Sequence, residues 1–431
     1  MADARRIAVI GGGWAGVAAA VEATARGDAV TLFEMAPQLG GRARSFEIDG
    51  VELDNGQHIA IGAYSATLAL LRRVGVDPAT AFLRTPLRLV DPEGCGLRLR
   101  SGPPALAFAA AVLEHAGWGW RDRAGLLRAA CGWVLQRFRC VPGLTVSALA
   151  ARTTRRVREE LIEPLCIAAL NTPAHAASAS VFLRVLRDAL FSGPGSSDLL
   201  LPRLPLSRLL PAPATEWLRA AGAQVNLACR VGRLEPVDAR WRVDGAGFDA
   251  VVLATSALEA ARLTAGLAPD WSRRAAALRY EPIVTVYLHS RGTRLSEPML
   301  CLRAGPEAPA QFVFDRGQLG GPPGLLAFVV SGAQAWVDRG REATLASVEQ
   351  QARESLSAQL VGELTACKVL TEHRATFACT PGLQRPGPVI APGLLAAADY
   401  VQGPYPATLE GAVRSGVAAA HLAHETATTD A

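Results

Sequence analysis

The sequence has little of what a membrane-spanning, metal-binding or nucleic-acid-binding protein needs. No run of eighteen apolar residues occurs, so no membrane-spanning helix is expected. The eight cysteines are dispersed without a CxxC pair, which indicates reduced, mostly buried thiols rather than metal ligands. The net charge is only +5, and scattered arginines supply it, since Lys368 is the only lysine. These absences give no support to a metal site or to nucleic-acid binding.

The N-terminal residues do not predict an export signal either. Only four apolar residues lie between Arg6 and the first glycine, which is too short for the core of a signal peptide. The expected compartment is therefore the cytoplasm. Aromatic residues are few (6%), but half of the 431 residues are hydrophobic and 19% are charged. A sizeable core is available, and the length allows two domains or one domain with a large insertion.

The first thirty-four residues follow the pattern of a βαβ unit. An apolar strand (5–10) leads into GGGWAG, an Ala-rich helix (17–26) and a second strand (29–33) that ends at Glu34. The glycines allow a tight turn and a close backbone approach to a pyrophosphate, and the helix offers its positive end. Glu34 is placed to accept a hydrogen bond from a ribose hydroxyl. The unit predicts a dinucleotide site with the glycine pattern Gly11, Gly13 and Gly16.

Two further segments favour FAD over NAD as that dinucleotide. Shortly after Glu34 comes GGR (40–42), a second glycine pair whose arginine can neutralise the pyrophosphate of a longer cofactor. Near the C-terminus, Asp399 follows a strand, and Thr408 is placed to cap a helix whose free N–H groups would face the flavin ring. Either segment alone also fits a solvated turn or a docking helix.

No second GxGxxG unit accompanies the first. The glycine-rich pieces at 193–197 and 320–324 do not lie between a strand and a helix. We therefore expect no separate NAD(P)H domain, so that electrons come from the substrate or from an external donor protein.

The middle of the chain has the character of an insertion. Residues 85–218 are rich in Leu, Ala and Arg at helical spacing, as in the stripe Leu127, Cys131, Val134, Leu135 and Phe138, and strand patterns return from 224 onward. We expect an α/β fold, in which a Rossmann-like FAD-binding domain is interrupted by a mixed α+β substrate domain with a helical cap. The expected FAD-binding segments are 1–84, 219–275 and 365–431, and the substrate-binding segments are 85–218 and 276–364.

The stretch VELDNGQHIAIGAY (51–64) interrupts a strand with a polar cluster. Asp54, Asn55, Gln57 and His58 follow an alternating strand, and apolar residues resume at once. A solvated hairpin turn and the polar floor of an active site both fit this pattern. The cluster lies between the Gly-Arg segment and the insertion, and the residues alone leave both interpretations open.

Together these segments resemble the FAD-dependent amine oxidase and phytoene desaturase superfamily over most of the chain. The resemblance is carried by GGGWAG, LGGRARSF, CRVGRLE, GFDAVVLATSA and GPYPATLEGAVRSG. Finer signatures resemble the hydroxysqualene dehydroxylases (squalene-associated FAD-dependent desaturases) of bacterial hopanoid synthesis. These signatures are DNGQHIAIGAY, EPLCIAALNTPAHAAS and SSDLLLPRLPLSRLLPAPATEWL. The branch implies an enzyme that reduces hydroxysqualene, a long-chain isoprenoid, to squalene at the expense of reduced FAD.

The resemblance also implies a set of FAD contacts. The backbone of Val231 should meet the adenine, Asp399 and Thr408 should lie on the flavin side, and the segment around His58 should line the cavity at the flavin. One departure is Ala398, because most relatives have glycine before the aspartate. The implied cofactor-binding residues are Gly11, Gly13, Trp14, Ala15, Gly16, Glu34, Gly41, Arg42, Gly56, Gln57, His58, Val231, Asp399, Thr408 and Leu409.

The implied reaction needs an acid. Loss of the hydroxyl group as water leaves an allylic cation, and hydride from reduced flavin N5 then completes the reduction. His58 and Asp54 are the proposed proton donors, and Glu163 and Asp198 are also available. His58 equally fits a residue that only packs on the flavin. Asp54 fits a turn carboxylate bonded to backbone, and the other two fit helix caps or ion-pair partners.

A squalene-like substrate is nearly insoluble in water, which implies that the enzyme meets it at a membrane. The segment 117–140 combines three tryptophans and five arginines with an apolar helical face. That composition fits peripheral docking at the inner face of the cytoplasmic membrane, and it also fits a cap helix packed on its neighbours.

Other functions on the same frame stay open. One is an oxidative polyprenoid desaturase or an amine oxidase, and another is a non-catalytic, flavin-bearing isoprenoid carrier. An amine oxidase usually has an aromatic cage or a lysine–water pair at the flavin, whereas this chain offers only Lys368 and five tyrosines.

Overall fold

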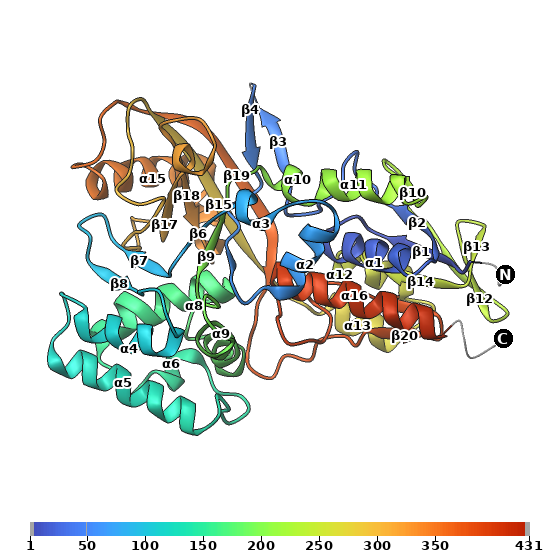
Figure 1. Cartoon of the computed structure of the whole chain (residues 1–431), viewed down its shortest axis with the longest axis horizontal. Coiled ribbons are helices and arrows are strands. Elements are labelled where there is room, and N and C mark those ends of the chain that lie inside the picture. The colour runs from blue at the N-terminus through green and yellow to red at the C-terminus, as the bar shows by residue number, and fades with distance from the viewer. Residues whose placement is uncertain (1–3, 49, 427–431) are drawn as a thin grey trace.

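The computed structural model describes residues 4–48 and 50–426, so the ends of the predicted FAD-binding segments (1–3 and 427–431) lie outside the described residues. Its first layer is a six-stranded sheet in the order β10-β2-β1-β14-β21-β20 (Figure 1). All neighbours pair in parallel except β20, which runs antiparallel at one edge. The strands are β1 (Arg6–Ile10), β2 (Ala29–Phe33), β10 (Gln224–Asn226), β14 (Ala250–Leu253), β20 (Val389–Ala391) and β21 (Leu394–Ala396).

The central strands β1 and β14 are continuous apolar runs because both faces of this sheet are covered. Alternate residues enter two separate cores: Ile7 and Val9 pack under one layer, and Ala8 and Ile10 pack under the other. The layer that covers Ile7 and Val9 consists of helices α1 (Trp14–Ala25), α2 (Ser65–Arg73), α11 (Pro211–Ala220) and α16 (Leu409–Thr426). The layer that covers Ala8 and Ile10 consists of α12 (Ala257–Thr264), α13 (Pro269–Ala276) and a small sheet of β11 (Leu234–Val237), β12 (Arg240–Val243) and β13 (Ala246–Phe248).

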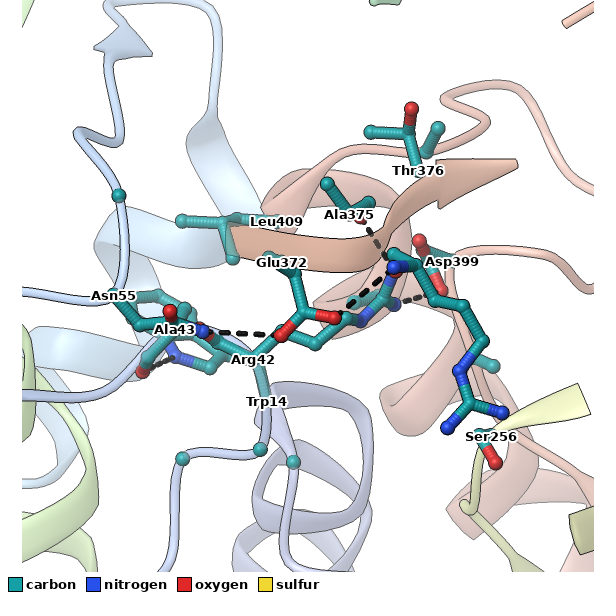
Figure 2. A pocket seen from close by; sticks show the side chains of 18 of the residues that line it. Trp14, Arg42, Ala43, Asn55, Ser256, Glu372, Ala375, Thr376, Asp399 and Leu409 are labelled. Atoms are coloured by element: carbon teal, nitrogen blue, oxygen red, sulfur yellow. Dashed lines mark hydrogen bonds and ion pairs between the residues drawn. The ribbon is translucent and has the colours of Figure 1, made fainter. Parts of the chain in front are cut away.

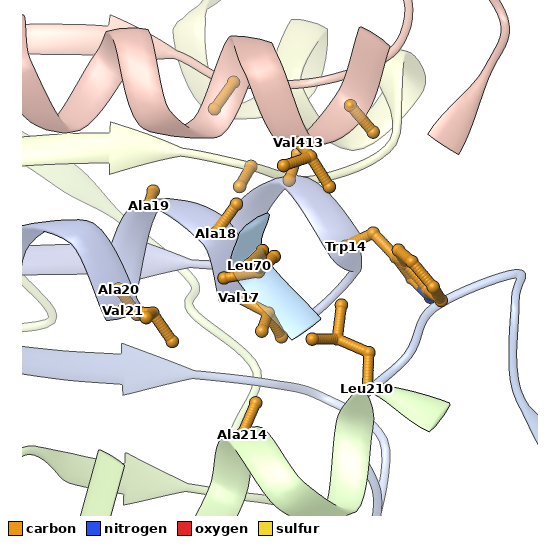
Figure 3. Close-up of a cluster of buried hydrophobic side chains, with 14 of the residues drawn as sticks. Trp14, Val17, Ala18, Ala19, Ala20, Val21, Leu70, Leu210, Ala214 and Val413 are labelled. Atoms are coloured by element: carbon orange, nitrogen blue, oxygen red, sulfur yellow. The ribbon is translucent and has the colours of Figure 1, made fainter. Parts of the chain in front are cut away.

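Small side chains let helix α1 lie close to its neighbours. Its alanines face α16 on one side and α11 on the other, and Val17 and Val413 lie in the same apolar cluster (Figure 3). A β-carbon on Gly416 of α16 would lie 2.1 Å from the carbonyl oxygen of Ala15, so this crossing requires glycine. The close packing fixes the N-termini of α1 and α16 relative to each other.

A second, antiparallel sheet has the order β16-β17-β18-β15-β19. On β15, Val284 and Val286 face a core under α15, whereas Ile283 and Thr285 face a cavity. The sheet thus has one packed face and one face available to a ligand. Its elements are β15 (Tyr280–Ser290), β16 (Met299–Cys301), β17 (Phe312–Asp315), β18 (Leu325–Val330) and β19 (Leu364–Phe377), with α14 (Gln334–Arg339) and α15 (Arg341–Ser355) beside it.

A helical cap stands next to this sheet and has its own core, which includes Leu126, Trp133 and Phe182 (Figure 1). A π-helical turn, η1, leads directly into α8, and the hairpin β7–β8 lies at the junction with the sheet. The elements are β7 (Arg88–Val90), β8 (Gly96–Arg98), α4 (Pro104–Glu114), α5 (Trp120–Leu135), α6 (Val146–Leu149), α7 (Arg155–Val157), η1 (Arg158–Ile162), α8 (Glu163–Leu170) and α9 (Ala179–Phe191).

Short elements connect these layers. The hairpin β3–β4 carries the start of the polar cluster, and β5-β9-β6 forms a small antiparallel sheet. Within residues 4–48 and 50–426, no helix combines the length and apolar character needed to cross a bilayer. The remaining elements are β3 (Ser45–Ile48), β4 (Val51–Asp54), β5 (Ala60–Ile61), α3 (Pro78–Ala81), β6 (Phe82–Thr85), β9 (Leu199–Pro202), α10 (Leu206–Leu209) and the 3-10 turn η2 (Arg316–Leu319).

The predicted α/β fold is confirmed, with a parallel sheet assembled from separated segments and an inserted antiparallel sheet with a helical cap. The exact division into domains stays a prediction, and the packing favours two changes to it. Helix α11, expected with the substrate domain, packs against α1, and α10 packs against α11 in the same core. Strand β19, expected with the FAD-binding domain, pairs with β15. Helical periodicity identifies an apolar face but does not say which layer will cover it.

Candidate functional site

The glycine turn lies between the end of β1 and the start of α1. Gly11 has φ +105°, and a β-carbon on Gly16 would lie 1.8 Å from the carbonyl oxygen of Gly11, so both positions require glycine. Gly13 precedes the helix without a side-chain cap, and a β-carbon there would meet no atom within 4 Å. The first turn of α1 therefore presents its N–H groups and positive end to open space, as a bound pyrophosphate requires.

Glu34 is fixed at the end of β2 by backbone N–H groups. Its Oε2 accepts a hydrogen bond from Gly12 N (2.6 Å), and its Oε1 accepts one from Ala36 N (2.8 Å). The carboxylate is almost fully buried, yet it lines the cavity described below. Because each carboxylate oxygen can accept more than one hydrogen bond, Glu34 can hold the glycine turn and a ribose hydroxyl together.

The second glycine pair lies directly against the first. Gly40 N donates to the carbonyl oxygen of Gly12 (2.8 Å), and a β-carbon on Gly41 would lie 3.1 Å from the Cα of Gly13. This contact delivers Arg42 to the centre of the site (Figure 2). Its guanidinium forms an ion pair with Asp399 (2.7 Å) and donates to the carbonyl oxygen of Ala375 (2.7 Å). Burial lowers the pKa of Arg42 and the charge of Asp399 raises it, with a net rise, so the side chain is a fixed cation.

The N-terminus of α16 closes the other side of the site. Thr408 Oγ1 accepts a hydrogen bond from Gly411 N (2.9 Å), which confirms the predicted cap, and the helix begins at Leu409. Ala398 lines the cavity and donates its N–H to Ser415 Oγ (3.1 Å), so the alanine is accommodated beside Asp399. The free N–H groups at this helix start suit a partial negative charge on a ligand.

Within the polar segment 54–58, His58 lines the cavity, whereas Asp54 does not. The Asp54 carboxylate is buried, accepts hydrogen bonds from Ser45 Oγ and Leu206 N (both 2.8 Å) and pairs with Arg316 (3.4 Å). His58 is half-buried and lines the cavity. Burial lowers its pKa, with the charge of Asp54 opposing the shift, so the ring is mainly neutral at pH 7.

The other two proposed acids lie away from the cavity lining. Asp198 forms an ion pair with Arg84 (2.7 Å), and Glu163 is exposed in the first turn of α8. Among the four proton donors that the sequence suggested, only His58 lines the cavity. Asp54 and Asp198 have the structural roles that were their alternative interpretation, a carboxylate bonded to backbone and an ion-pair partner.

One cavity of about 550 Å³ brings the predicted residues together. Every cofactor-binding residue expected from the sequence lines it, except Gly16, which lies behind the turn. Val231 lines it from the loop before β11, and its carbonyl oxygen accepts a hydrogen bond from Arg262 Nη2 (3.1 Å). The glycine turn, Arg42, Asp399 and the start of α16 are therefore arranged along one continuous surface that suits a long dinucleotide.

The opposite wall of the cavity is mostly apolar. Register places Thr285 opposite Val329 and Leu370, so this wall is one face of the antiparallel sheet. Residues 167–171 of the helical cap extend it. The sheet residues that form it are Ile283, Thr285, Phe312, Phe314, Val329 and Leu370. Such a wall suits a hydrocarbon substrate laid against the cofactor.

Sequence reasoning missed Glu372, which lies on β19 at the edge of this wall. Its Oε2 accepts a hydrogen bond from Asn55 Nδ2 (3.2 Å), so it links the sheet to the polar segment (Figure 2). The pairing of Glu372 with Ile283 depends on a long-range register with a bulge. The alternation in LTACKVLTEHRATF identifies a strand, but it does not reveal the partner strand.

Comparisons with known proteins agree with this geometry. A sequence model of flavin-containing amine oxidoreductases matches residues 14–424. The chain is similar to the hydroxysqualene dehydroxylase of Rhodopseudomonas palustris, with 29% identity over 97% of this chain and 98% of the relative. It is also 29% identical to the hydroxysqualene dehydroxylase of Sinorhizobium fredii, over 97% of this chain and 98% of the relative. A solved oxidoreductase from Methanosarcina mazei shares the fold, with a TM-score of 0.70 and 16% identity over 96% of this chain and 99% of that one. The predicted superfamily is thus confirmed, and the chain belongs to the family of flavin-containing amine oxidoreductases.

Proposed function

We propose that the chain is an FAD-dependent hydroxysqualene dehydroxylase, which reduces hydroxysqualene to squalene and releases water. The observation that carries the proposal is full-length similarity to hydroxysqualene dehydroxylases in a chain whose cavity faces an apolar wall. In the overall reaction, one hydride adds to the carbon of hydroxysqualene, and the hydroxyl group leaves with one proton as water. The reduction therefore consumes a reduced flavin, and an external donor must restore it.

FAD fits the residues that line the cavity. The N–H groups of the glycine turn and the cation of Arg42 would hold the pyrophosphate, and Glu34 would hold a ribose hydroxyl. The helix start at Leu409 would face the flavin end. When bound, the reduced cofactor supplies the hydride, and the protein supplies position and electrostatics.

The remaining residues of the cavity have to hold the substrate and exclude water. The sheet face around Thr285, Phe312 and Phe314 would hold the isoprenoid chain and keep water from recapturing an allylic cation. His58 would donate the proton to the leaving hydroxyl, because it lines the cavity and a histidine ring can carry a dissociable proton. Asp54 would have a positioning role for the polar segment, because its carboxylate accepts hydrogen bonds from Ser45 and Leu206 outside the cavity.

An oxidative reaction on the same frame is the second candidate, and the fold shared with other flavin oxidoreductases favours it. Lys368, the only lysine of the chain, does not line the cavity, so a lysine–water pair has no support here. A non-catalytic isoprenoid carrier would bind the same ligands without turnover.

The test is an anaerobic reaction with each class of substrate. Purified holoprotein is reduced with dithionite, excess reductant is removed, and hydroxysqualene is added while the flavin spectrum and the product mass are followed. We expect reoxidation of the flavin together with squalene. Reduction of the oxidised protein by an amine or a polyprenoid, with no reaction of hydroxysqualene, would support the oxidative candidate instead. Retention of both ligands without any redox change would indicate a carrier.

A further inference from the structure

Helix α5 of the cap is apolar on two sides. One side is packed, and the other is exposed except at Leu127, which packs against the core of the cap. Its inward side buries Leu126 and Trp133 in the core of the cap. Its outward side carries a second apolar stripe, in which residues follow one another at spacings of four, three, four and four, so that they share one face of the helix. We call this the α5 stripe, and it consists of Trp120, Ala124, Leu127, Cys131 and Leu135.

The α5 stripe is open to solvent along most of its length. Trp120 is 73% exposed and Leu135 is 84% exposed, and Val134 beside it is also exposed. A helix on the surface of a globular protein normally turns polar residues outward. Of the three tryptophans in segment 117–140, Trp118 and Trp133 are buried, so only Trp120 is free to meet a partner.

The polar residues around the α5 stripe are cationic. Arg121 and Arg128 are exposed on its flank, and the Arg121 guanidinium lies over the Trp120 ring, 5.5 Å from its centroid. Neither arginine forms an ion pair with an acid within the part of the chain that the structure describes. The acid of the helix, Asp122, is held by Thr154 Oγ1 (2.5 Å) and by Gly119 N (3.0 Å). Apolar side chains flanked by unpaired arginines complement a surface that offers hydrocarbon beneath a layer of negative charge.

We propose that the α5 stripe docks the protein on the surface of a bilayer that contains anionic phospholipid. The inference deepens the proposed function, because the bilayer would be the source of the apolar substrate. Only the identity of that substrate rests on the proposed function. Helix α5 is about 24 Å long, which suits a helix lying in the interface. The same cap contains α8, whose residues line the cavity, so the cap connects the docking helix to the substrate wall (Figure 1).

Vesicle flotation with the full-length holoprotein tests this inference without any need for turnover. The probes are phosphatidylcholine vesicles with and without phosphatidylglycerol. We expect the protein to float with the anionic vesicles, and we expect high salt to weaken that binding. The double substitution Trp120→Gln and Leu135→Gln should lower the partition by about tenfold or more, because two exposed apolar side chains no longer enter the bilayer. Arg121→Gln with Arg128→Gln should remove the preference for anionic lipid.

Matched controls are available on other surfaces. Val361 and Val389 are exposed by 76% and 52%, and their replacement by Gln should leave flotation unchanged. Arg26→Gln with Arg274→Gln removes the same charge from other exposed positions. Thermal unfolding and turnover on detergent-dispersed substrate should be unaffected in the Trp120/Leu135 variant, whereas turnover on substrate in vesicles should fall.

Three results would overturn the proposal. The wild-type protein could fail to float with any vesicle, or the Trp120/Leu135 variant could float as well as the wild type. Alternatively, light scattering could reveal a dimer that the Trp120/Leu135 variant disrupts, which would identify a second copy of the chain as the occupant. Loss of flotation with intact turnover in detergent would separate the docking surface from the reaction.

Discussion

His58 rests on a network of buried polar groups at the base of the polar segment. Tyr287 Oη donates to the carbonyl oxygen of Asp54 (2.9 Å), and Gln57 Nε2 donates to Tyr287 Oη (2.8 Å). Arg316 adds a hydrogen bond to Gln57 Oε1 (3.1 Å). The backbone before His58 is therefore anchored to the antiparallel sheet, and the ring enters the cavity from a rigid support, as a proton donor requires.

Turnover should depend on the protonation of His58. Because burial lowers the pKa of His58 below its ordinary 6.5, the charged ring is a minor species at pH 7. The protonated fraction rises as pH falls, so kcat/KM for dehydroxylation should increase from pH 8 downward and level off below the lowered pKa. His58→Gln should lower kcat/KM by about a hundredfold or more and flatten the profile. The measurement is kcat/KM against pH for both proteins, each with its flavin content checked.

An unchanged pH profile in a fully active His58→Gln protein would show that His58 lines the cavity without donating the proton. Glu372→Gln is a useful control because Glu372 also lines the cavity and contacts the same segment through Asn55. If that variant alone loses the pH dependence, Glu372 rather than His58 carries the proton.

Asp54 should matter for stability more than for proton transfer. Asp54→Ala would leave the buried cation of Arg316 without its partner and two donors, Ser45 and Leu206, without an acceptor. The expected loss is roughly 3 kcal/mol in the free energy of unfolding. Denaturant unfolding of the holoprotein measures it, and Arg316→Met added to Asp54→Ala should restore part of the loss. A variant that unfolds like the wild type but no longer turns over would instead support Asp54 as the acid.

At the scale of elements, the start of α16 lines the cavity and also caps helix α2. Glu410 is fully buried, and its carboxylate accepts hydrogen bonds from the backbone N–H groups of Ala66 (3.1 Å) and Thr67 (2.9 Å) at the start of α2. Arg414, one turn later, pairs with the same carboxylate (2.7 Å). One side chain therefore caps a neighbouring helix and fixes the position of Leu409 at the cavity.

Glu410→Ala should destabilise this junction. Removal of the carboxylate leaves two buried N–H groups and the Arg414 cation without their partner, at a cost of about 2–4 kcal/mol. Thermal unfolding and the flavin retained after gel filtration should fall together, because the same helix start lines the proposed cofactor site. Glu216→Ala removes an exposed glutamate from helix α11 and serves as the control. Loss of stability with full flavin retention would separate the cap from the cofactor site.

The elements differ in how far local sequence predicts them. The turn at Gly11–Gly16 and the cap at Thr408 were predictable, because each depends on the backbone conformation and hydrogen bonds of a few adjacent residues. The pairing of β15 with β19 was not, because register between distant strands depends on the whole sheet and here includes bulges. Glu372 was missed for that reason.

At the scale of the whole molecule, residues distant in sequence meet at one cavity. Arg42 and Asp399 form an ion pair across most of the chain, and the βαβ unit packs against the last helix, α16. Sequence patterns predicted the glycine turns, Arg42, Asp399 and Thr408 for this side of the cavity, and the family resemblance implied the other lining residues. They left open whether the apolar face of segment 117–140 is exposed or packed, since apolar periodicity does not distinguish a buried face from an exposed one.

The most direct test of the central claim is a single turnover with reduced holoprotein. Anaerobic protein, reduced and freed of excess reductant, is mixed with excess hydroxysqualene, and flavin oxidation is compared with squalene formed. One hydride leaves each reduced flavin, so we predict one squalene for each flavin oxidised, and no squalene from the oxidised protein. Squalene formed by the oxidised protein, or flavin that stays reduced while hydroxysqualene is recovered unchanged, would contradict the account.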